Sequence, residues 1–192
     1  MSLDTIAAIS TGCPGAIGIV RISGDKTAQI VHGIFRETSG RKISDFLPRK
    51  LYFGTFHDTN GDVIDHGLCT ISRAPASYTG EDTAEFHLHG SSVLLSLALD
   101  TICAAGARLA EPGEFTRRAF LHGRLDLMQA EAVVDLIDAQ SPLAAKNAAG
   151  QLARALSDQI EQVAEKLSSI LAHFHASAPR ARRAMPGLFA HL

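Results

Sequence analysis

The stretch that decides the fold is EPGEFTRRAFLHGRLDLMQAEAVVDLID, residues 111–138. Before it, short apolar runs alternate with glycine-containing turns; after Pro112 and Gly113, strand signals stop and helix-forming residues dominate. This change in composition predicts a boundary near residue 118. We therefore expect an α+β protein, with a mixed α/β domain over residues 1–118 and a helical hairpin or partial bundle over residues 119–175.

Two apolar stripes with helical spacing follow the boundary and predict helices over residues 127–139 and 143–175. The first stripe is Leu127, Ala130, Val134 and Ile137, and the second is Leu152, Leu156, Ile160, Val163, Leu167 and Ile170. Half a bundle leaves these stripes uncovered, so we expect them to promote self-association. Residues 176–192 lose the periodicity and contain proline and arginine, which predicts an unstructured tail.

The region before the boundary contains clear strand and helix signals. Residues 4–9 and 18–22 favour strands, and Ser23 is a candidate cap for a short helix that ends near Phe35. Asn60 and Gly61 predict a hairpin turn between strands over residues 51–57 and 63–72. Alternating polarity predicts a strand over residues 83–89, followed by an apolar helix over residues 92–104.

Composition limits the environment and the partners of the chain. The formal net charge of the 192 residues is −2, so any contact with RNA has to be local or supplied by a partner. Cys13, Cys69 and Cys103 form no Cys-x-x-Cys pair, which argues against a disulfide framework and a zinc site and favours a cytoplasmic location. No apolar run approaches the roughly 20 residues of a membrane span, and the N-terminus does not resemble a signal peptide.

Several motifs, in this order and spacing, resemble those of the tRNA-modifying GTPase family MnmE, also called TrmE. They cover most of residues 4–170. The motifs are DTIAA (4–8), GIVRISG (18–24), YTGED (78–82), HLHG (87–90), GARLAEPGEFTR (106–117), RAFL (118–121), and GRLDLMQAEA (123–132) leading to DLID (135–138).

The resemblance implies a fold, a cofactor and partners. The first domain of that family is similar to the tetrahydrofolate-binding part of the glycine-cleavage T protein, binds 5-formyl-tetrahydrofolate or a related folate, and mediates homodimerisation. A helical domain follows, interrupted by a GTPase domain. With the flavoprotein MnmG, the family modifies carbon 5 of the wobble uridine of certain tRNAs. The resemblance thus implies a folate-binding, dimer-forming protein of tRNA modification.

Three residues match the family's folate contacts: Arg21, Glu81 and Arg124. A carboxylate can accept the adjacent N–H donors of a reduced pterin, and cations can meet the glutamyl carboxylate of folate. The third position is commonly lysine in the family, and arginine keeps its charge but changes its shape. Without the resemblance, Arg21 and Arg124 are interpreted as surface ion-pair formers and Glu81 as a turn residue.

The GTPase signature of the family does not occur in these residues. No Gly-x-x-x-x-Gly-Lys-Ser/Thr run is present, and that run is what holds phosphates and magnesium. GTP, magnesium and potassium would therefore belong to a missing GTPase domain, and we predict no GTP hydrolysis by this chain alone and no catalytic residue within it. The basic segment after Phe174 suggests a natural truncation, a shifted reading frame or artificial shortening.

Three further features have structural interpretations that we favour. Glu114, near a helix start, is expected to satisfy free N–H groups. His87 and His89 share a strand face with Glu85 and could bind a metal, but polar packing explains them better, so no metal site is predicted. Cys13 is interpreted as a small loop residue.

Two alternative functions stay open. One is a stand-alone one-carbon-transfer enzyme of the glycine-cleavage T protein kind, against which the helical half argues. The other is a purely structural dimerisation module whose folate site has decayed.

Overall fold

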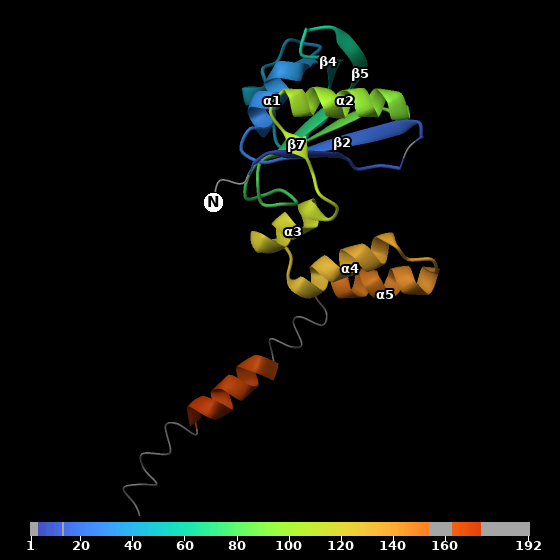
Figure 1. The fold of residues 1–192 in the computed structure, drawn as a ribbon. Helices are drawn as coiled ribbons and strands as arrows, with labels where there is room; N and C mark the ends of the chain where they lie inside the picture. Colours follow the sequence, from blue (N-terminus) through green and yellow to red (C-terminus); the bar gives the residue numbers. More distant parts are fainter. Residues whose placement is uncertain (1–3, 13, 154–162, 174–192) are drawn as a thin grey trace, which may run out of the picture. The chain divides into compact units, whose positions relative to one another are not determined.

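The computed structural model describes residues 4–12, 14–153 and 163–173 (Figure 1). The chain divides into two compact units, Met1–Asp126 (unit 1) and Leu127–Leu192 (unit 2). The predicted boundary at residue 118 lies inside α3 (Glu114–Leu121), which belongs to unit 1. Cys13 and the predicted tail over residues 176–192 lie outside the described residues.

Unit 1 is built on a sheet of seven strands in the order β3-β4-β5-β6-β2-β1-β7. All neighbouring strands are antiparallel except β1 and β7, which are parallel. The strands are β1 (Ile6–Ile9), β2 (Ile17–Ser23), β3 (Phe35–Glu37), β4 (Tyr52–His57), β5 (Val63–Ser72), β6 (Thr83–His89) and β7 (Arg108–Leu109).

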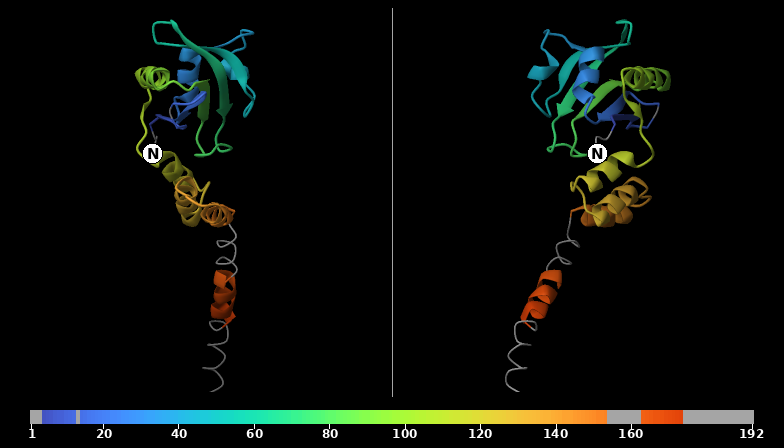
Figure 2. Two further views of the ribbon diagram at one scale, coloured as in Figure 1. Left: turned by 90° about the vertical axis from the view of Figure 1, so that its right-hand side faces the viewer. Right: turned by 60° about the vertical axis from the view of Figure 1, so that its left-hand side comes forward.

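Two helices, α1 (Thr27–Ile34) and α2 (Ser92–Ala104), cover one face of this sheet (Figures 1 and 2). Val20 of β2 lies opposite Phe86 of β6, and both are fully buried in the core beneath the helices. Gly18 leaves room for Leu95 of α2, because a side chain at Gly18 would clash with that leucine. A short 3-10 helix, η1 (Ile43–Asp45), lies in the segment between β3 and β4.

The opposite face of the sheet is covered by neither α1 nor α2, and α3 (Glu114–Leu121) reaches Arg21 on it through the ring of Phe115. The strand period of two places Arg21 across from Glu85 and Ile19 across from His87 on this face. Its side chains are half-buried or exposed, and Phe53 exposes 53% of its surface. Polar groups on this open face are therefore accessible to a ligand.

Sequence reasoning predicted most of unit 1, and the α+β class is confirmed. The hairpin of β4 and β5, the strand β6 and the helix α2 lie where expected. The assignment of Ser23 as a helix cap is wrong: α1 begins after Lys26 with no side-chain cap, and the Ser23 hydroxyl binds Thr79 and Glu81 instead.

Unit 2 contains α4 (Leu127–Ile137) and α5 (Pro142–Leu152), which pack against each other, and residues 163–173 are also helical. The Ser141 hydroxyl accepts the amide of Ala144 at the start of α5. The Gln129 side chain donates to the Leu152 carbonyl at 2.8 Å and so ties α4 to the end of α5. The predicted helix over residues 143–175 is described only in part, because residues 154–162 and 174–175 lie outside the described range.

None of the helices in the described ranges is long and apolar enough to cross a membrane.

Candidate functional site

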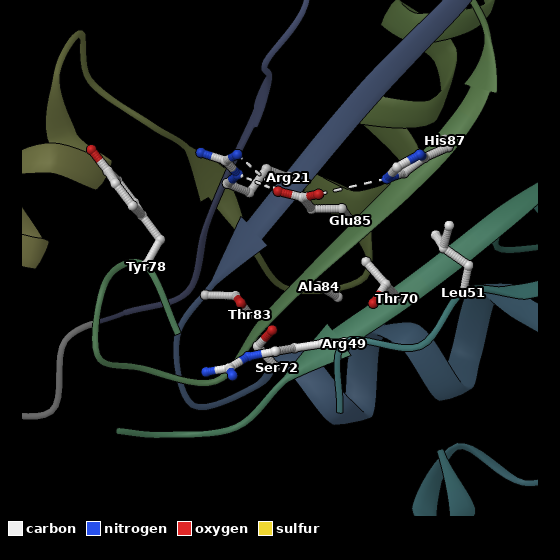
Figure 3. A pocket seen from close by; sticks show the side chains of 10 residues that line it. All are labelled: Arg21, Arg49, Leu51, Thr70, Ser72, Tyr78, Thr83, Ala84, Glu85 and His87. Atoms are coloured by element: carbon white, nitrogen blue, oxygen red, sulfur yellow. Dashed lines mark hydrogen bonds and ion pairs between the residues drawn. The ribbon is translucent and has the colours of Figure 1, made fainter. Parts of the chain in front are cut away.

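A cavity of about 340 Å³ opens on the face of the sheet that the helices leave uncovered (Figure 3). Strands β2, β5 and β6 supply its floor, and the segments before β4 and β6 supply its sides. The lining residues are Arg21, Arg49, Leu51, Thr70, Ser72, Tyr78, Thr83, Ala84, Glu85 and His87.

Arg21 is held firmly in this cavity. Its Nε and Nη2 each lie 2.8 Å from Glu85 Oε1, and its guanidinium lies 5.6 Å from the ring centre of Tyr78 and 5.7 Å from that of Phe115. The ion pair and the two rings together restrict the side chain before any ligand arrives. About 30% of the Arg21 side chain stays exposed, so part of its charge faces the cavity.

A second cation reaches the cavity from Arg49. Its backbone φ is 63°, in the left-handed region that a non-glycine residue rarely occupies. Its Nη2 donates to the Ala76 carbonyl at 2.7 Å, and its amide donates to the Ile71 carbonyl at 2.7 Å. Sequence reasoning missed this residue, because its role depends on a backbone conformation that the local sequence does not predict.

The two histidines of β6 contact different acids. His87 Nε2 lies 3.5 Å from Glu85 Oε2, whereas His89 Nδ1 lies 2.8 Å from Asp65 Oδ1. Burial works to raise the pKa of Asp65, but hydrogen bonds from the His89 and His66 amides and the His89 ring lower it overall. His89 thus makes a close polar contact, whereas the buried Nε2 of His87 has no hydrogen-bond partner among the described residues.

Glu81 lies in the turn between β5 and β6 and is tightly held. Its Oε2 accepts the Ser23 hydroxyl at 2.6 Å, and both carboxylate oxygens accept Arg118 Nη1, at 3.1 and 3.2 Å. Gly80 makes this turn possible, because its φ is +80° and a side chain there would meet His122 and Arg124. The Glu81 side chain is 12% exposed, so its carboxylate is directed largely into the protein.

Arg124 anchors the same turn from the other side. Its Nε donates to the Ser77 carbonyl at 3.0 Å, and the nearby His122 ring donates to the Thr79 carbonyl at 2.7 Å. The segment over residues 77–81 thus contacts Arg124 through Ser77, Arg21 through Tyr78, and contains Glu81.

The three predicted site residues are therefore gathered around one turn, but they are not in mutual contact. Arg21 lines the cavity, whereas Glu81 and Arg124 are not among its lining residues. No hydrogen bond or ion pair joins Arg21 to either of the other two in the described part of the chain. What they share is the turn over residues 77–81, which contains Glu81 and contacts Arg21 and Arg124.

Sequence reasoning missed Arg118, the residue at the centre of the supporting network. Its side chain is only 2% exposed, and it donates to Glu81, to the Asp4 carbonyl at 2.7 Å, to Asp4 Oδ1 at 2.9 Å and to Glu114 Oε1 at 3.0 Å. Burial acts to lower the pKa of Arg118, but the carboxylates of Glu114, Glu81 and Asp4 raise it overall. The spacing of Glu114 and Arg118 by four residues was the signal that could have indicated the pair.

Glu114 accepts a backbone amide near the start of α3 and also forms ion pairs. Its Oε2 accepts the Glu111 amide, as expected, but the carboxylate also pairs with Arg108 at 2.7 Å and with Arg118. The hydrogen bond from Arg108 is the main cause that lowers the pKa of Glu114 to about 2, against the opposing effect of burial. Glu114 is therefore ionised at neutral pH and pairs with three arginines, Arg108, Arg118 and, at 3.6 Å, Arg117.

Comparisons with known proteins show the family of the chain. The family described as GTP-binding protein TrmE N-terminus matches residues 5–124. The chain is 47% identical over 177 residues to the tRNA modification GTPase MnmE of Symbiobacterium thermophilum, covering 92% of this chain and 39% of that protein. It is 45% identical over 171 residues to the Clostridioides difficile protein of the same name, covering 88% and 37% of the two chains.

The Aquifex aeolicus protein of the same name is 45% identical over 186 residues, which are 96% of this chain and 40% of that one. The chain thus spans about two fifths of the length of these curated relatives. The family match covers β1 to α3, the helix that carries Arg118, and ends at Arg124. It therefore includes the turn over residues 77–81 together with Arg21, Glu81 and Arg124. This chain belongs to the MnmE (TrmE) family and corresponds to its N-terminal region.

Proposed function

We propose that unit 1 binds a reduced folate, 5-formyl-tetrahydrofolate or a close relative, at the turn over residues 77–81. The observation that carries the proposal is that this single turn contacts or contains Arg21, Glu81 and Arg124. The cavity beside it has room for a small ligand and holds a positively charged guanidinium next to an aromatic ring.

Each residue has a distinct role in this proposal. Glu81 accepts N–H donors of the pterin through the part of its carboxylate that stays exposed, 12% of the side chain, and Arg118 and Ser23 fix the position of that carboxylate beforehand. Arg21 and Arg124 meet the polar and anionic parts of the folate. The protein positions the one-carbon donor, and the transfer chemistry belongs to the folate itself.

The wider role that we propose follows the named relatives, which are tRNA modification GTPases. The folate bound here would supply the one-carbon unit for modification of the wobble uridine at carbon 5, together with an MnmG-like flavoprotein, in the cytoplasm. GTP hydrolysis, with its magnesium and potassium, is assigned to a GTPase segment of the longer relatives.

Calorimetric titration of the purified chain with 5-formyl-tetrahydrofolate tests the binding proposal. We expect Arg21→Ala and Glu81→Gln each to weaken binding roughly 10- to 100-fold, because each substitution removes one or two hydrogen bonds between a charged group and the folate. Glutamine at position 81 keeps an oxygen that can accept from Ser23, so the turn should persist. Arg117→Ala is the matched control, because Arg117 is exposed and pairs with Glu111 and, at 3.6 Å, with Glu114, not with Glu81 or Glu85.

The absence of heat and of any folate-dependent change in melting temperature for the unmutated chain would refute the folate proposal. It would favour the alternative of a structural dimerisation module. Measurable transfer of the formyl group by the chain alone would favour the stand-alone enzyme instead.

We also propose that the chain forms a homodimer through the open face of the sheet. Leu51 and Phe53 project from this face and are 49% and 53% exposed, which is unusual for large apolar side chains gathered on one sheet face. Phe53→Arg should shift the chain to a monomer in analytical ultracentrifugation at micromolar concentration. A Phe53→Arg chain that sediments as the unmutated chain does would assign self-association to another surface, such as the stripes of unit 2.

A further inference from the structure

A basic cleft of about 480 Å³ lies at the edge of unit 1 beside β3, away from the turn that we assign to folate. Four basic side chains line it from three parts of the chain: His32 of α1, Arg36 of β3, and Arg41 and Lys42 from the loop before η1. Glu37 is the one acid among the lining residues.

Within the described residues, Glu37 forms no ion pair with these cations. One oxygen of its carboxylate accepts the amide of Ser39 at 2.9 Å, the hydroxyl of Ser39 at 2.6 Å and the amide of Arg41 at 3.0 Å. The hydrogen bond from the Ser39 hydroxyl is the main cause of a lowered pKa for Glu37. The acid is therefore used to shape the loop that carries Arg41 and Lys42.

The cations themselves are available to an anion. Within the described residues, no ion pair joins Arg36 or Lys42 to a carboxylate, and both are exposed. Arg41 lies 5.8 Å from the ring centre of Tyr52, which restricts it without removing its charge. The three permanent cations and one acid give this cleft a formal charge of +2, whereas the whole chain carries −2.

A second hollow of about 400 Å³ adjoins the basic cleft and shares His32, Lys42 and Ile43 with it. It continues past Ala28 and Gln29 of α1 to Arg73, whose charge is paired with Asp82. A single small anion needs one cationic pocket, whereas a nucleotide chain needs a charged place for its phosphate and adjoining space for its sugar and base. The paired hollows fit the second case.

We propose that the basic cleft binds the phosphodiester backbone of RNA and thereby helps to hold the RNA substrate against unit 1. Lysine and arginine contacts to phosphates position nucleic acid without reading its sequence. The choice of RNA as the occupant rests on the proposed role in tRNA modification, whereas the affinity for phosphate groups rests on the cleft alone.

The test uses the full chain and a fluorescent tRNA transcript with uridine at the wobble position, followed by anisotropy at several salt concentrations. Arg36→Gln with Lys42→Gln removes two exposed charges from the cleft, and Lys146→Gln with Lys166→Gln removes two exposed charges from unit 2 as the matched control. Each phosphate contact contributes about 0.7 to the slope of log affinity against log salt for single-stranded nucleic acid.

We expect the cleft variant to lower that slope by about 1.4 and to weaken binding roughly 25-fold at 0.1 M salt. The unit 2 variant should change binding less than about threefold. Equal losses in the two variants, or an unchanged slope in the cleft variant, would overturn the proposal. Displacement of the transcript by millimolar inorganic phosphate as effectively as by excess unlabelled transcript would also overturn it, in favour of a site for free phosphate.

Folate titration of the same cleft variant separates this proposal from the folate proposal. Because Arg36 and Lys42 lie outside the turn over residues 77–81, the affinity for 5-formyl-tetrahydrofolate should equal that of the unmutated chain. A chain that binds the transcript through the cleft but takes up no folate would refute the folate proposal alone. A cleft variant that loses both ligands together would refute the assignment of a separate RNA surface.

Discussion

Units 1 and 2 bury their side chains in opposite ways. Unit 1 encloses large apolar residues such as Phe56, Phe86 and Leu95, which are fully buried. Among the described residues of unit 2, the buried side chains are those of Gln129, Ala132 and Ala148, while Ile137 is 78% exposed. The contrast teaches that unit 1 has a core of its own, whereas the large apolar residues of α4 and α5 need a further surface to cover them.

The strongest test of this contrast is the removal of Arg118 from unit 1. Arg118→Ala leaves Glu81 and Glu114 without their shared buried partner, and we expect unfolding in urea to become easier by about 3–5 kcal/mol. Arg117→Ala removes an exposed arginine that pairs with Glu111 at 3.1 Å and with Glu114 at 3.6 Å, leaves the buried pair of Glu114 and Arg118 in place, and should cost less than about 1 kcal/mol. Similar losses for these two neighbours would mean that the buried network does not stabilise unit 1.

A matched pair of leucines compares the two units directly. Leu95 of α2 is 0% exposed and Leu127 of α4 is 66% exposed. We expect Leu95→Ala to lower the free energy of unfolding by about 2–5 kcal/mol, and Leu127→Ala by less than about 1 kcal/mol. Urea unfolding followed by circular dichroism measures both. A large loss for Leu127→Ala would show that self-association already buries the stripe of unit 2.

Acid should weaken unit 1 through Glu114. Its pKa is depressed to about 2 in the folded chain, so its stabilising effect is present at neutral pH and is lost as the pH falls toward 2. We expect the free energy of unfolding to decline from about pH 5 downward. In Glu114→Gln the free energy of unfolding should be lower at neutral pH and should decline less steeply as the pH falls. Parallel acid limbs in the two chains would contradict the assignment.

The smallest effect should come from Arg124→Lys. Lysine keeps the positive charge that faces the proposed folate but cannot reproduce the hydrogen bond from Arg124 Nε to the Ser77 carbonyl. We expect the dissociation constant for 5-formyl-tetrahydrofolate to change by less than about threefold. A loss of tenfold or more would mean that fixing Ser77 matters more than the charge.

The sequence predicted those elements that local patterns determine. Alternating polarity placed β6, and the turn at Asn60 and Gly61 placed the hairpin of β4 and β5. The short edge strands β3 and β7 were missed, because two or three residues carry no period and β7 is defined by its pairing with Ile6, about a hundred residues away.

The candidate site was also predictable only in part, because its contacts join residues that lie far apart in the sequence. Motif resemblance selected Arg21, Glu81 and Arg124, which the structure gathers around one turn. It could not indicate that Glu81 is held by Ser23, 58 residues earlier, since a serine before a helix is ordinarily a cap. Long-range contacts such as that between Arg118 and the Asp4 carbonyl need the folded chain to be seen.

The central claim is that folate binding is a property of unit 1. Calorimetric titration of 5-formyl-tetrahydrofolate into a shortened chain of residues 1–126 tests it most directly, beside the full chain of 192 residues. Because the turn over residues 77–81 and its three surrounding residues all lie in unit 1, the two chains should bind with dissociation constants equal within about threefold. Binding by the full chain together with none by a folded 1–126 chain would contradict the account.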